Sequence, residues 1–261
     1  MRILRYIFKL FILNLKKESF FRSSFIMDLI GNISWVLIYF LFFKIIFSNV
    51  KSIGDWNESL IYILLGSSGI IFSLFSALCN YGAGSISSLV RNGTIEIFLL
   101  KPVPAPLFIL FRFASISHLL SLIPPSIIFI YGVSNYGNFH ILNFILYLIS
   151  IFISFFIYSL LHLLFGLLAF KFVEVTPLFF ILGDFADLGK YPYLIFPKAL
   201  QLFFFYIIPI LLITNFPVLV YTGKYYFLIL QMLVLFILIL LIYILFPIGR
   251  KIYQGTGTYK G

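Results

Sequence analysis

Long apolar segments constrain the fold of this chain more than any other feature of its sequence. The segment 227–246 contains no charged residue, and segments of similar character recur along the chain. Of the 261 residues, 62% are hydrophobic, which amounts to about 162 side chains, and only 10% are charged. A membrane-spanning helix needs about 20 apolar residues, and a soluble domain is about 25% charged. We therefore predict an all-α integral membrane protein and exclude a soluble enzyme, a disordered chain and a disulfide-stapled secreted domain.

Six of the apolar segments are long enough to cross a bilayer as helices. We predict spans at 25–47, 59–78, 107–131, 140–170, 172–190 and 227–246. Pro124 and Pro125 fall inside the third of these, where a double proline is expected to kink the helix. The segment 1–22 differs, because its basic residues recur at helical spacing between apolar ones. We expect it to form an interfacial helix that lies on the membrane surface.

The region from 172 to 222 leaves two layouts open. In the first, 172–190 is the fifth span and the proline-containing segment 198–222 is a re-entrant hairpin on the outer side. In the second, 172–197 lies at the membrane interface and 199–222 crosses. Either layout gives six crossings, so both termini are expected on the same side of the membrane.

The basic residues assign that side. Thirteen of the 18 Lys and Arg residues lie in the N-terminal segment, in the loop 80–106 with the adjoining Arg112, at Lys171, or near the C-terminus. Cytoplasmic loops carry an excess of Lys and Arg. We therefore expect both termini and the 80–106 loop to be cytoplasmic, in a multi-pass protein of the bacterial inner membrane. The formal net charge of +10 then reflects orientation in the lipid bilayer, and we expect no nucleic-acid partner.

Motifs for catalysis are missing from the sequence. It has no G-x-x-x-x-G-K-[ST] phosphate loop, no H-E-x-x-H and no G-x-S-x-G. The three histidines, His118, His140 and His162, are scattered, and Cys79 is the only cysteine. We therefore expect no catalytic residue in this chain and no metal or cofactor bound by it.

Several polar residues fall within the predicted spans. Ser67 and Ser68 belong to a Gly-Ser-Ser-Gly run, and such small residues either let helices pack closely or wall a substrate pathway. Asp184 and Asp187 share a helix face because they are three residues apart. Lys190 follows closely, which favours a water interface for the two aspartates over a pathway lining. An ion-coupled secondary transporter or channel that uses intramembrane Asp and His residues is the alternative function. An intramembrane enzyme is disfavoured, since no opposed catalytic pair is present.

The loop 80–106 is the longest stretch that does not qualify as a span. Residues 85–91 are expected to form a short helix that Gly93 ends, and 95–100 a second, amphipathic piece. Three alternating prolines then favour rigid, extended backbone. A short, stiff helix at the membrane surface suits the transmission of force from a soluble partner, and an ordinary interhelical loop is the alternative.

Two motifs give the chain a specific resemblance to a known family. The segment 90–103, VRNGTIEIFLLKPV, resembles the R-x-G-x-(hydrophobic)-E/D-x-x-L-x-(R/K)-P segment of type-2 ABC exporter permeases, and most of all their antibiotic-resistance-type branch. The region from Lys190 through Pro197 to Gly223 is similar to the proline-rich region between the fifth and sixth spans of that branch. Lys101 stands where Arg is common in the family, which keeps the charge but loses the planar fork.

The resemblance, which covers essentially the whole chain, implies a half-transporter. It implies one transmembrane domain over 1–261, with six transmembrane helices, the N-terminal interfacial helix, a cytoplasmic coupling helix and extracytoplasmic re-entrant helices. Two permease subunits, identical or paralogous, would form the pathway, and separate ATPase subunits that bind ATP and Mg would dock on the cytoplasmic face. The implied ATPase-coupling residues are Arg91, Gly93, Glu96, Leu99, Leu100, Lys101 and Pro102. The residues implied for the outward-facing re-entrant region are Tyr191, Pro192, Pro197, Pro209 and Pro217, which favours the first layout. The cargo stays open.

Overall fold

The computed structural model of the protein describes residues 22–100, 104–111, 115, 117–172 and 174–253. Its longest helices are α2 (Arg22–Phe47), α3 (Glu58–Leu78), α9 (Ile123–Tyr136), α10 (Ile141–Leu167) and α15 (Tyr226–Ile252). Shorter helices are α4 (Asn80–Gly84), α5 (Ile86–Arg91), α6 (Glu96–Leu99), α7 (Ala105–Phe111), α8 (Ser117–Leu120), α11 (Ala169–Phe172), α12 (Thr176–Leu188), α13 (Lys198–Leu202) and α14 (Ile210–Tyr221). Two single turns, η1 (Tyr193–Ile195) and η2 (Phe203–Ile207), flank α13.

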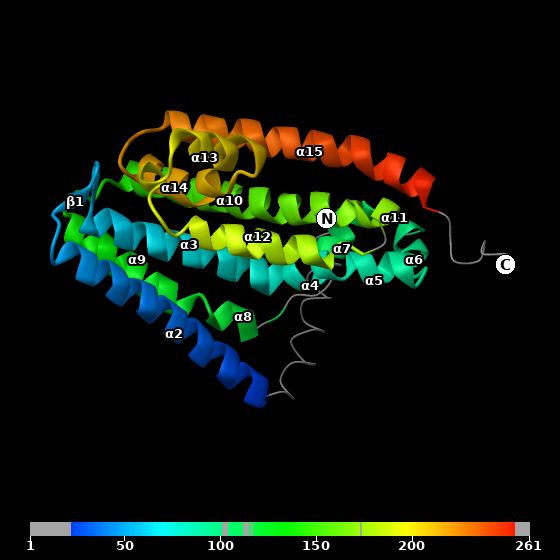
Figure 1. Ribbon diagram of the computed structural model, residues 1–261, viewed down its shortest axis with the longest axis horizontal. Coiled ribbons are helices and arrows are strands. Elements are labelled where there is room, and N and C mark those ends of the chain that lie inside the picture. Colours follow the sequence, from blue (N-terminus) through cyan, green and yellow to red (C-terminus); the bar gives the residue numbers. More distant parts are fainter. Residues whose placement is uncertain (1–21, 101–103, 112–114, 116, 173, 254–261) are drawn as a thin grey trace.

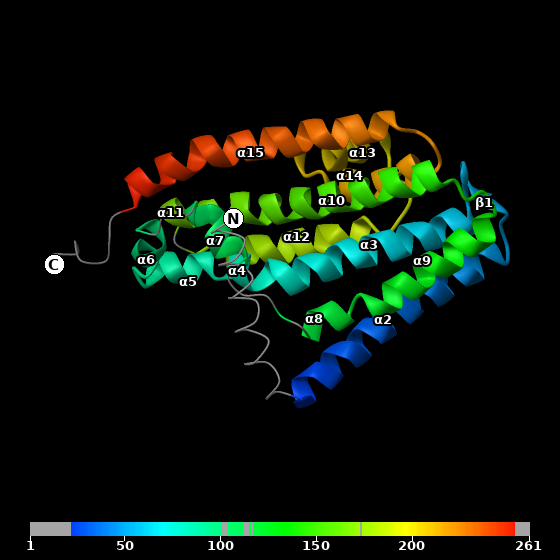
Figure 2. The same ribbon diagram turned by 180° about the vertical axis from the view of Figure 1, so that it is seen from behind.

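The long helices run side by side along one axis of the molecule (Figure 1). One end carries the antiparallel strands β1 (Ser52–Ile53) and β2 (Trp56–Asn57), and we call it the hairpin end. The opposite end carries α5, α6 and α11, and we call it the α6 end. In both views α3 and α10 lie in the middle, with α2 and α9 on one side and α15 on the other (Figures 1 and 2). The protein is therefore an all-α integral membrane protein, as its sequence predicts.

Helix α3 forms the centre of the bundle, and glycines allow it to lie close to α9. A Cβ atom built on Gly66 would lie 2.6 Å from the Phe129 Cα, and one built on Gly132 would lie 2.8 Å from the Ile63 backbone nitrogen. Both distances are shorter than real Cβ contacts allow, so only glycine fits at these two crossings. Small residues at the contact let the two backbones approach until their dispersion contacts replace those with lipid.

The hairpin end fixes the start of α3. Gly54 has φ +60°, a left-handed conformation that glycine adopts without strain, and it closes the turn between β1 and β2. The Asn57 side chain then caps α3, because its Oδ1 accepts a hydrogen bond of 2.9 Å from the Leu60 backbone N–H. Trp56 is buried beneath the turn.

The third predicted span, 107–131, is displaced in the structure. Its first part is the separate helix α7, and the membrane-length segment is instead 118–136, formed by α8 and α9. Pro124 and Pro125 lie in the first turn of α9, so the break in this segment falls just before them, at residues 121–122 between α8 and α9. Proline is favoured in a first turn because its missing N–H has no intrahelical partner there anyway.

The fifth crossing is split between two short helices. Helix α12 has 13 residues and α14 has 12, so at a rise of 1.5 Å per residue neither reaches the roughly 30 Å of a bilayer core. A Cβ built on Gly189, just after α12, would lie 2.9 Å from the Thr214 Cγ2 atom of α14, so the second helix begins where the first ends. The intervening residues bend by 93° between α13–η2 and α14. Each of the two predicted layouts thus describes half of this crossing.

A buried asparagine holds the chain between these two helices. The Asn215 Oδ1 of α14 accepts a 2.9 Å hydrogen bond from the Tyr193 backbone N–H, and its Nδ2 donates to the Tyr191 carbonyl at 3.3 Å. When the bent pair formed by α13–η2 and α14 is counted as one span, the described residues contain up to six helical segments that are long and apolar enough to cross a membrane. The interfacial helix predicted at 1–22 lies almost entirely outside the described residues.

Candidate functional site

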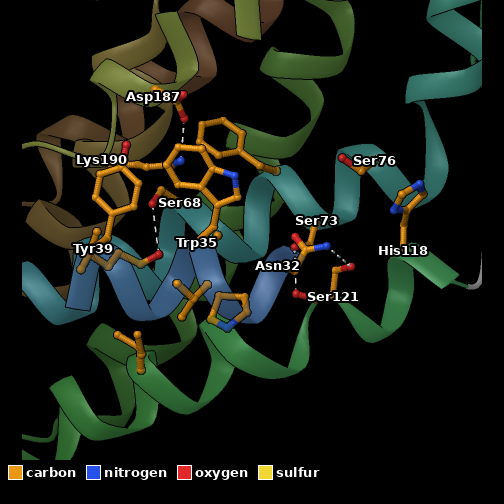
Figure 3. A pocket seen from close by; sticks show the side chains of 16 residues that line it. Asn32, Trp35, Tyr39, Ser68, Ser73, Ser76, His118, Ser121, Asp187 and Lys190 are labelled. Carbon is orange, nitrogen blue, oxygen red and sulfur yellow. Dashed lines mark hydrogen bonds and ion pairs between the residues drawn. The ribbon is translucent and has the colours of Figure 1, made fainter. Parts of the chain in front are cut away.

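A cavity of about 350 Å³ lies between α2, α3, the α8–α9 segment and α12 (Figure 3). Its walls are partly apolar, with Val36, Leu65 and Phe72 among them. Its neutral polar lining consists of Asn32, Ser68, Ser73, Ser76, Ser121 and His118, and its charged lining of Asp187 and Lys190. We call it the polar cavity. A cavity with several polar groups in the middle of a membrane-embedded bundle is a candidate binding site.

The two charges of the polar cavity neutralise each other. The Lys190 Nζ donates a 2.5 Å hydrogen bond to the Asp187 Oδ1. The same ammonium lies 4.5 Å from the ring centroid of Tyr39 and 4.9 Å from that of Trp35. Both rings belong to α2, so cation–π attraction joins α2 to the end of α12 (Figure 3).

A row of hydroxyl groups crosses the middle of the polar cavity. The Ser73 Oγ donates to the Ser121 carbonyl at 3.0 Å, and the Asn32 Nδ2 donates to the Ser121 Oγ at 3.0 Å (Figure 3). The Ser68 Oγ donates to the Leu65 carbonyl at 3.1 Å. These bonds connect α2, α3 and the α8–α9 segment through groups that also face the cavity.

The structure brings together some of the residues that the sequence singled out for a pathway. Ser68 and Asp187 line the polar cavity. Ser67 instead is buried on another face of α3, where its Oγ lies 2.8 Å from the Tyr147 hydroxyl. Asp184 is exposed and is absent from the described cavity lining. Asp187 and Lys190 both line the polar cavity, where the Asp187 side chain is 48% exposed and that of Lys190 18% exposed.

The residues that α2 and α8 contribute to the polar cavity are not among those predicted from the sequence. Asn32, Trp35 and Tyr39 follow one another at helical spacing, which would have indicated a common face of α2. Nothing in the sequence indicates that this face meets Lys190. His118 likewise reaches the cavity only through the tertiary fold.

His162, named in the ion-coupled alternative, lies outside the lining of the polar cavity. Its Nδ1 lies 3.1 Å from the Tyr158 carbonyl of the preceding turn. Its ring packs 4.2 Å from the Phe75 centroid and is parallel to Phe179 at 5.8 Å. These contacts are those of a packed core residue.

A second region of interest is the projection at the α6 end, formed by residues 80–100. Helix α5 is followed by Gly93, which has φ +72° and turns the chain into α6. Ile95 is fully buried, and the Phe98 ring lies 5.6 Å from that of Phe108 on α7. The projection is thus a packed unit with its own small core.

The outer face of this projection is unusual for a region beyond the long helices. Leu100 is 85% exposed and Ile97 60% exposed, and Glu96, at the start of the same short helix, is exposed too. Arg91, at the end of α5, is also exposed. Leu99 is half-buried. Lys101 and Pro102, which the family resemblance also implied, lie outside the described residues.

The inner face of the projection is bonded to other parts of the bundle. The Arg91 Nη1 forms a 3.2 Å ion pair with the Glu174 Oε2, which precedes α12. The Ser87 Oγ accepts from the Val175 backbone N–H at 3.2 Å, and the Tyr253 hydroxyl after α15 lies 3.4 Å from the Val90 carbonyl. A displacement of α5 would therefore reach α12 and α15 directly.

The outer residues implied by the resemblance are distributed over the turns between α12 and α14. The Tyr191 ring contacts those of Tyr39 and Phe43 on α2, and Pro192 precedes η1. Pro197 precedes α13, Pro209 precedes α14, and Pro217 lies buried inside α14.

These features define a polytopic helical membrane protein with a polar cavity in its bundle and a packed projection at one end. A family model described as ABC-2 family transporter protein matches residues 33–257. The chain belongs to this family, which confirms the type-2 ABC permease resemblance. It is a multi-pass permease component of an ABC transporter, a class that associates with ABC ATPase subunits and is generally not itself catalytic. No match was found among curated proteins or among solved structures.

Proposed function

We propose that the protein is the permease subunit of an ATP-driven exporter, that two permease subunits form the translocation pathway, and that segment 85–101 couples them to separate ATPase subunits. In this proposal the α6 end is cytoplasmic, in a bacterial inner membrane, with both termini on that side. The ATP and Mg are bound by the ATPase partner. This chain contributes the pathway and the contact that receives the motion.

The observation that carries the proposal is the exposed apolar surface of the α6-end projection. A leucine that is 85% exposed at the end of a short helix that begins with the exposed Glu96 has the composition of a small docking anchor with a polar rim. Arg91, Lys171, Arg250 and Lys251 gather at the same end, which agrees with a cytoplasmic location. In this proposal the projection extends beyond the bilayer, so its exposed apolar side chains do not face lipid and are available to a protein partner.

The bonds on the inner face suggest how motion of the ATPase pair would reach the membrane. The Arg91–Glu174 ion pair and the Ser87–Val175 hydrogen bond join α5 to the start of α12. Helix α12 then leads to Asp187 and Lys190 in the polar cavity. Closure of the ATPase pair would shift α5 and α12 together and alter the cavity, which is the requirement for alternating access.

Co-purification with the ATPase partner tests the coupling contact. The tagged full-length permease is purified in a mild detergent from its own cells, the ABC ATPase that it captures is identified by mass spectrometry, and ATP hydrolysis of the complex is measured after reconstitution. Leu100→Asp should abolish capture of the ATPase and its stimulation, and Glu96→Ala should weaken both. Val50→Asp is the matched control, because Val50 is also an exposed aliphatic residue but lies at the hairpin end. Normal capture by Leu100→Asp, or equal loss in Val50→Asp, would overturn the proposed contact.

A further inference from the structure

The hydroxyl groups of the polar cavity retain hydrogen-bonding capacity for a ligand. Ser73 and Ser68 use their hydroxyl hydrogens on backbone carbonyls, which leaves their oxygen lone pairs as acceptors. The Ser121 Oγ accepts from Asn32, which leaves its own hydrogen as a donor. All of these groups line the same cavity. Its middle therefore presents both donors and acceptors, and each of them is uncharged.

One end of the polar cavity carries two further polar groups that make no hydrogen bond to the described residues. In the described part of the chain, neither the Ser76 hydroxyl nor the His118 ring nitrogens has a hydrogen-bond partner. The centroid of the His118 ring lies 5.9 Å from that of the Tyr81 ring. Polar groups that line a cavity in a membrane-embedded bundle are usually bonded, so an unbonded hydroxyl and imidazole indicate a place for a ligand's polar atoms (Figure 3).

The other end of the polar cavity is already electrically neutral. Asp187 pairs with Lys190, and Lys190 lies against the rings of Trp35 and Tyr39. A charged head group would have to separate this pair or remain without a counter-ion in a medium of low dielectric constant. An uncharged head group leaves the pair intact. The lining thus discriminates against net charge in either direction.

The size and openness of the polar cavity limit how much of a ligand enters. About 350 Å³ is at the small end of the range for ligand pockets, enough for a compact head group. Trp35 lines the cavity and is also 52% exposed, so the cavity opens past α2. Only 6% of the residues in the apolar part of α2 are buried, so this helix faces outward beside the opening. An apolar tail could remain outside α2 while the head group occupies the cavity.

We infer that the polar cavity binds an uncharged, hydroxyl-rich head group of the kind that a glycoside carries. Ser76 and His118 bond its hydroxyls at one end, the row of Ser73 and Ser121 bonds them in the middle, and the Asp187–Lys190 pair excludes charged competitors. That this ligand is the cargo rests on the proposed exporter function. That the cavity binds it does not, because binding needs neither ATP nor the ATPase.

Fluorescence of a single tryptophan can measure this binding. The chain has only two tryptophans, so Trp56→Phe leaves Trp35, at the polar cavity, as the only one. The full-length variant is reconstituted into lipid vesicles without an ATPase and titrated, below micelle-forming concentrations, with octyl glucoside, the cationic octyltrimethylammonium or the anionic octyl sulfate. The three probes share a chain and differ in head group. We expect a saturable change in Trp35 emission with octyl glucoside and only the weak, non-saturable change of bilayer partition with the two charged probes.

Two cavity variants and two matched controls identify the site. In the Trp56→Phe background, His118→Phe and Ser76→Ala should each raise the half-saturating octyl glucoside concentration about fivefold, the usual effect of one lost hydrogen bond. His140→Phe and Ser134→Ala should leave it unchanged, since both residues are outside the described cavity lining. Ser76→Ala removes a single atom, so it gives a reading even if His118→Phe fails to fold.

A fourth probe, methyl glucoside, distinguishes a head group that arrives on a soluble molecule from one that belongs to a lipid. Saturation by methyl glucoside alone supports the inference and indicates a soluble glycoside, whereas saturation by octyl glucoside alone supports it and indicates a ligand that enters from the bilayer. Equal responses to all three octyl probes, no saturable response to either glucoside, or half-saturation that both cavity variants leave unchanged would overturn it. None of these outcomes depends on the ATPase capture experiment, so the two proposals can fail separately.

Discussion

Helix α3 meets α9 on one face and α2 on another, and the two contacts have opposite character. At α9 the backbones touch through Gly66 and Gly132, with no space for a methyl group. Along α2 the polar cavity lies between the two helices, and the Phe40 ring of α2 stacks on that of Tyr62 of α3 at 5.0 Å. The other contacts of α2 at the cavity reach different elements, through the Asn32–Ser121 hydrogen bond and the rings around Lys190. In the apolar segment of α3, 67% of the residues are buried, whereas only 6% of those in the apolar segment of α2 are buried.

The difference separates a rigid part of the molecule from a part that can move. Close backbone packing has a single arrangement, because any rotation of α9 would bring backbone atoms into collision. The contacts of α2 with α12 are polar and aromatic, they surround a cavity, and they can be exchanged for contacts with a ligand. We expect α3 and α9 to move as one body and α2 to move relative to them.

The largest effect that the comparison predicts is that of a methyl group at the α3–α9 contact. Gly66→Ala would place a Cβ 2.5 to 2.7 Å from Phe129 atoms that include backbone, so the helices must separate. We expect a loss of about 1–3 kcal/mol in unfolding free energy, seen as a lower thermal unfolding midpoint in detergent. Gly183→Ala is the control, because nothing lies within 4 Å of its Cβ position. Equal midpoints for the two variants would show that α3 and α9 are not rigidly packed.

A smaller effect is expected from the ion pair between Asp187 and Lys190. Each of Asp187→Asn and Lys190→Met should lower the unfolding free energy by about 1 kcal/mol, a value reduced for the partial exposure of Asp187. The double variant should lose less than the sum, because removing either partner already breaks the pair. Strict additivity in this cycle would mean that the two side chains do not interact across the polar cavity.

The hydrogen bond from α2 to the α8–α9 segment should contribute less to the unfolding free energy than the Asp187–Lys190 ion pair does. Asn32→Leu removes the donor to the Ser121 Oγ and should lower the unfolding free energy by about 0.6 kcal/mol, the average for such bonds between membrane helices. Ser34→Ala serves as the control on α2, because its hydroxyl bonds only to the Ile30 carbonyl of its own helix. A loss as large as that of Gly66→Ala would contradict the view that α2 is the loosely held helix.

The smallest effect concerns pH at the α6 end. Hydrogen bonds from Thr176, with the Arg91 guanidinium adding to them, hold the pKa of the Glu174 carboxyl below its usual value of 4.5. Because this pKa is lower in the folded than in the unfolded protein, the ionised carboxylate stabilises the fold at every pH above the pKa of the unfolded state. The stabilisation is lost as the pH falls through the pKa of the folded state. The midpoint difference between the protein and Glu174→Gln should therefore be constant above about pH 5 and shrink below pH 4.5. Arg91→Gln should keep most of this dependence, since Thr176 is the larger cause.

The sequence predicts the class of fold well, but it predicts poorly where the membrane helices are interrupted. Apolar length alone identifies α3, α10 and α15, because membrane helices must satisfy their backbone internally. The third span was predicted too early in the chain, since Pro124 and Pro125 were interpreted as a kink and instead begin α9. The fifth was left between two layouts because α12 and α14 are each too short to be recognised as spans.

The polar cavity was predictable only in part, for a different physical reason. Ser68 and Asp187 stand out as polar residues in apolar surroundings. Trp35, Tyr39 and His118 do not, because their role depends on which helix faces which, and that is fixed by packing across long sequence separations. The Lys190 side chain was interpreted as a sign of water, whereas aromatic rings of α2 provide its surroundings.

The interruption between α12 and α14 makes Asn215 more than a polar residue in a buried helix. A chain that leaves helical geometry within a bilayer exposes amide and carbonyl groups that water does not reach. The Asn215 carboxamide, itself built like a peptide group, bonds one of each, the Tyr193 N–H and the Tyr191 carbonyl. The Asn215 side chain thus makes the two hydrogen bonds that a neighbouring peptide group would make. One side chain therefore satisfies backbone groups of the bent segment that no helix pairs.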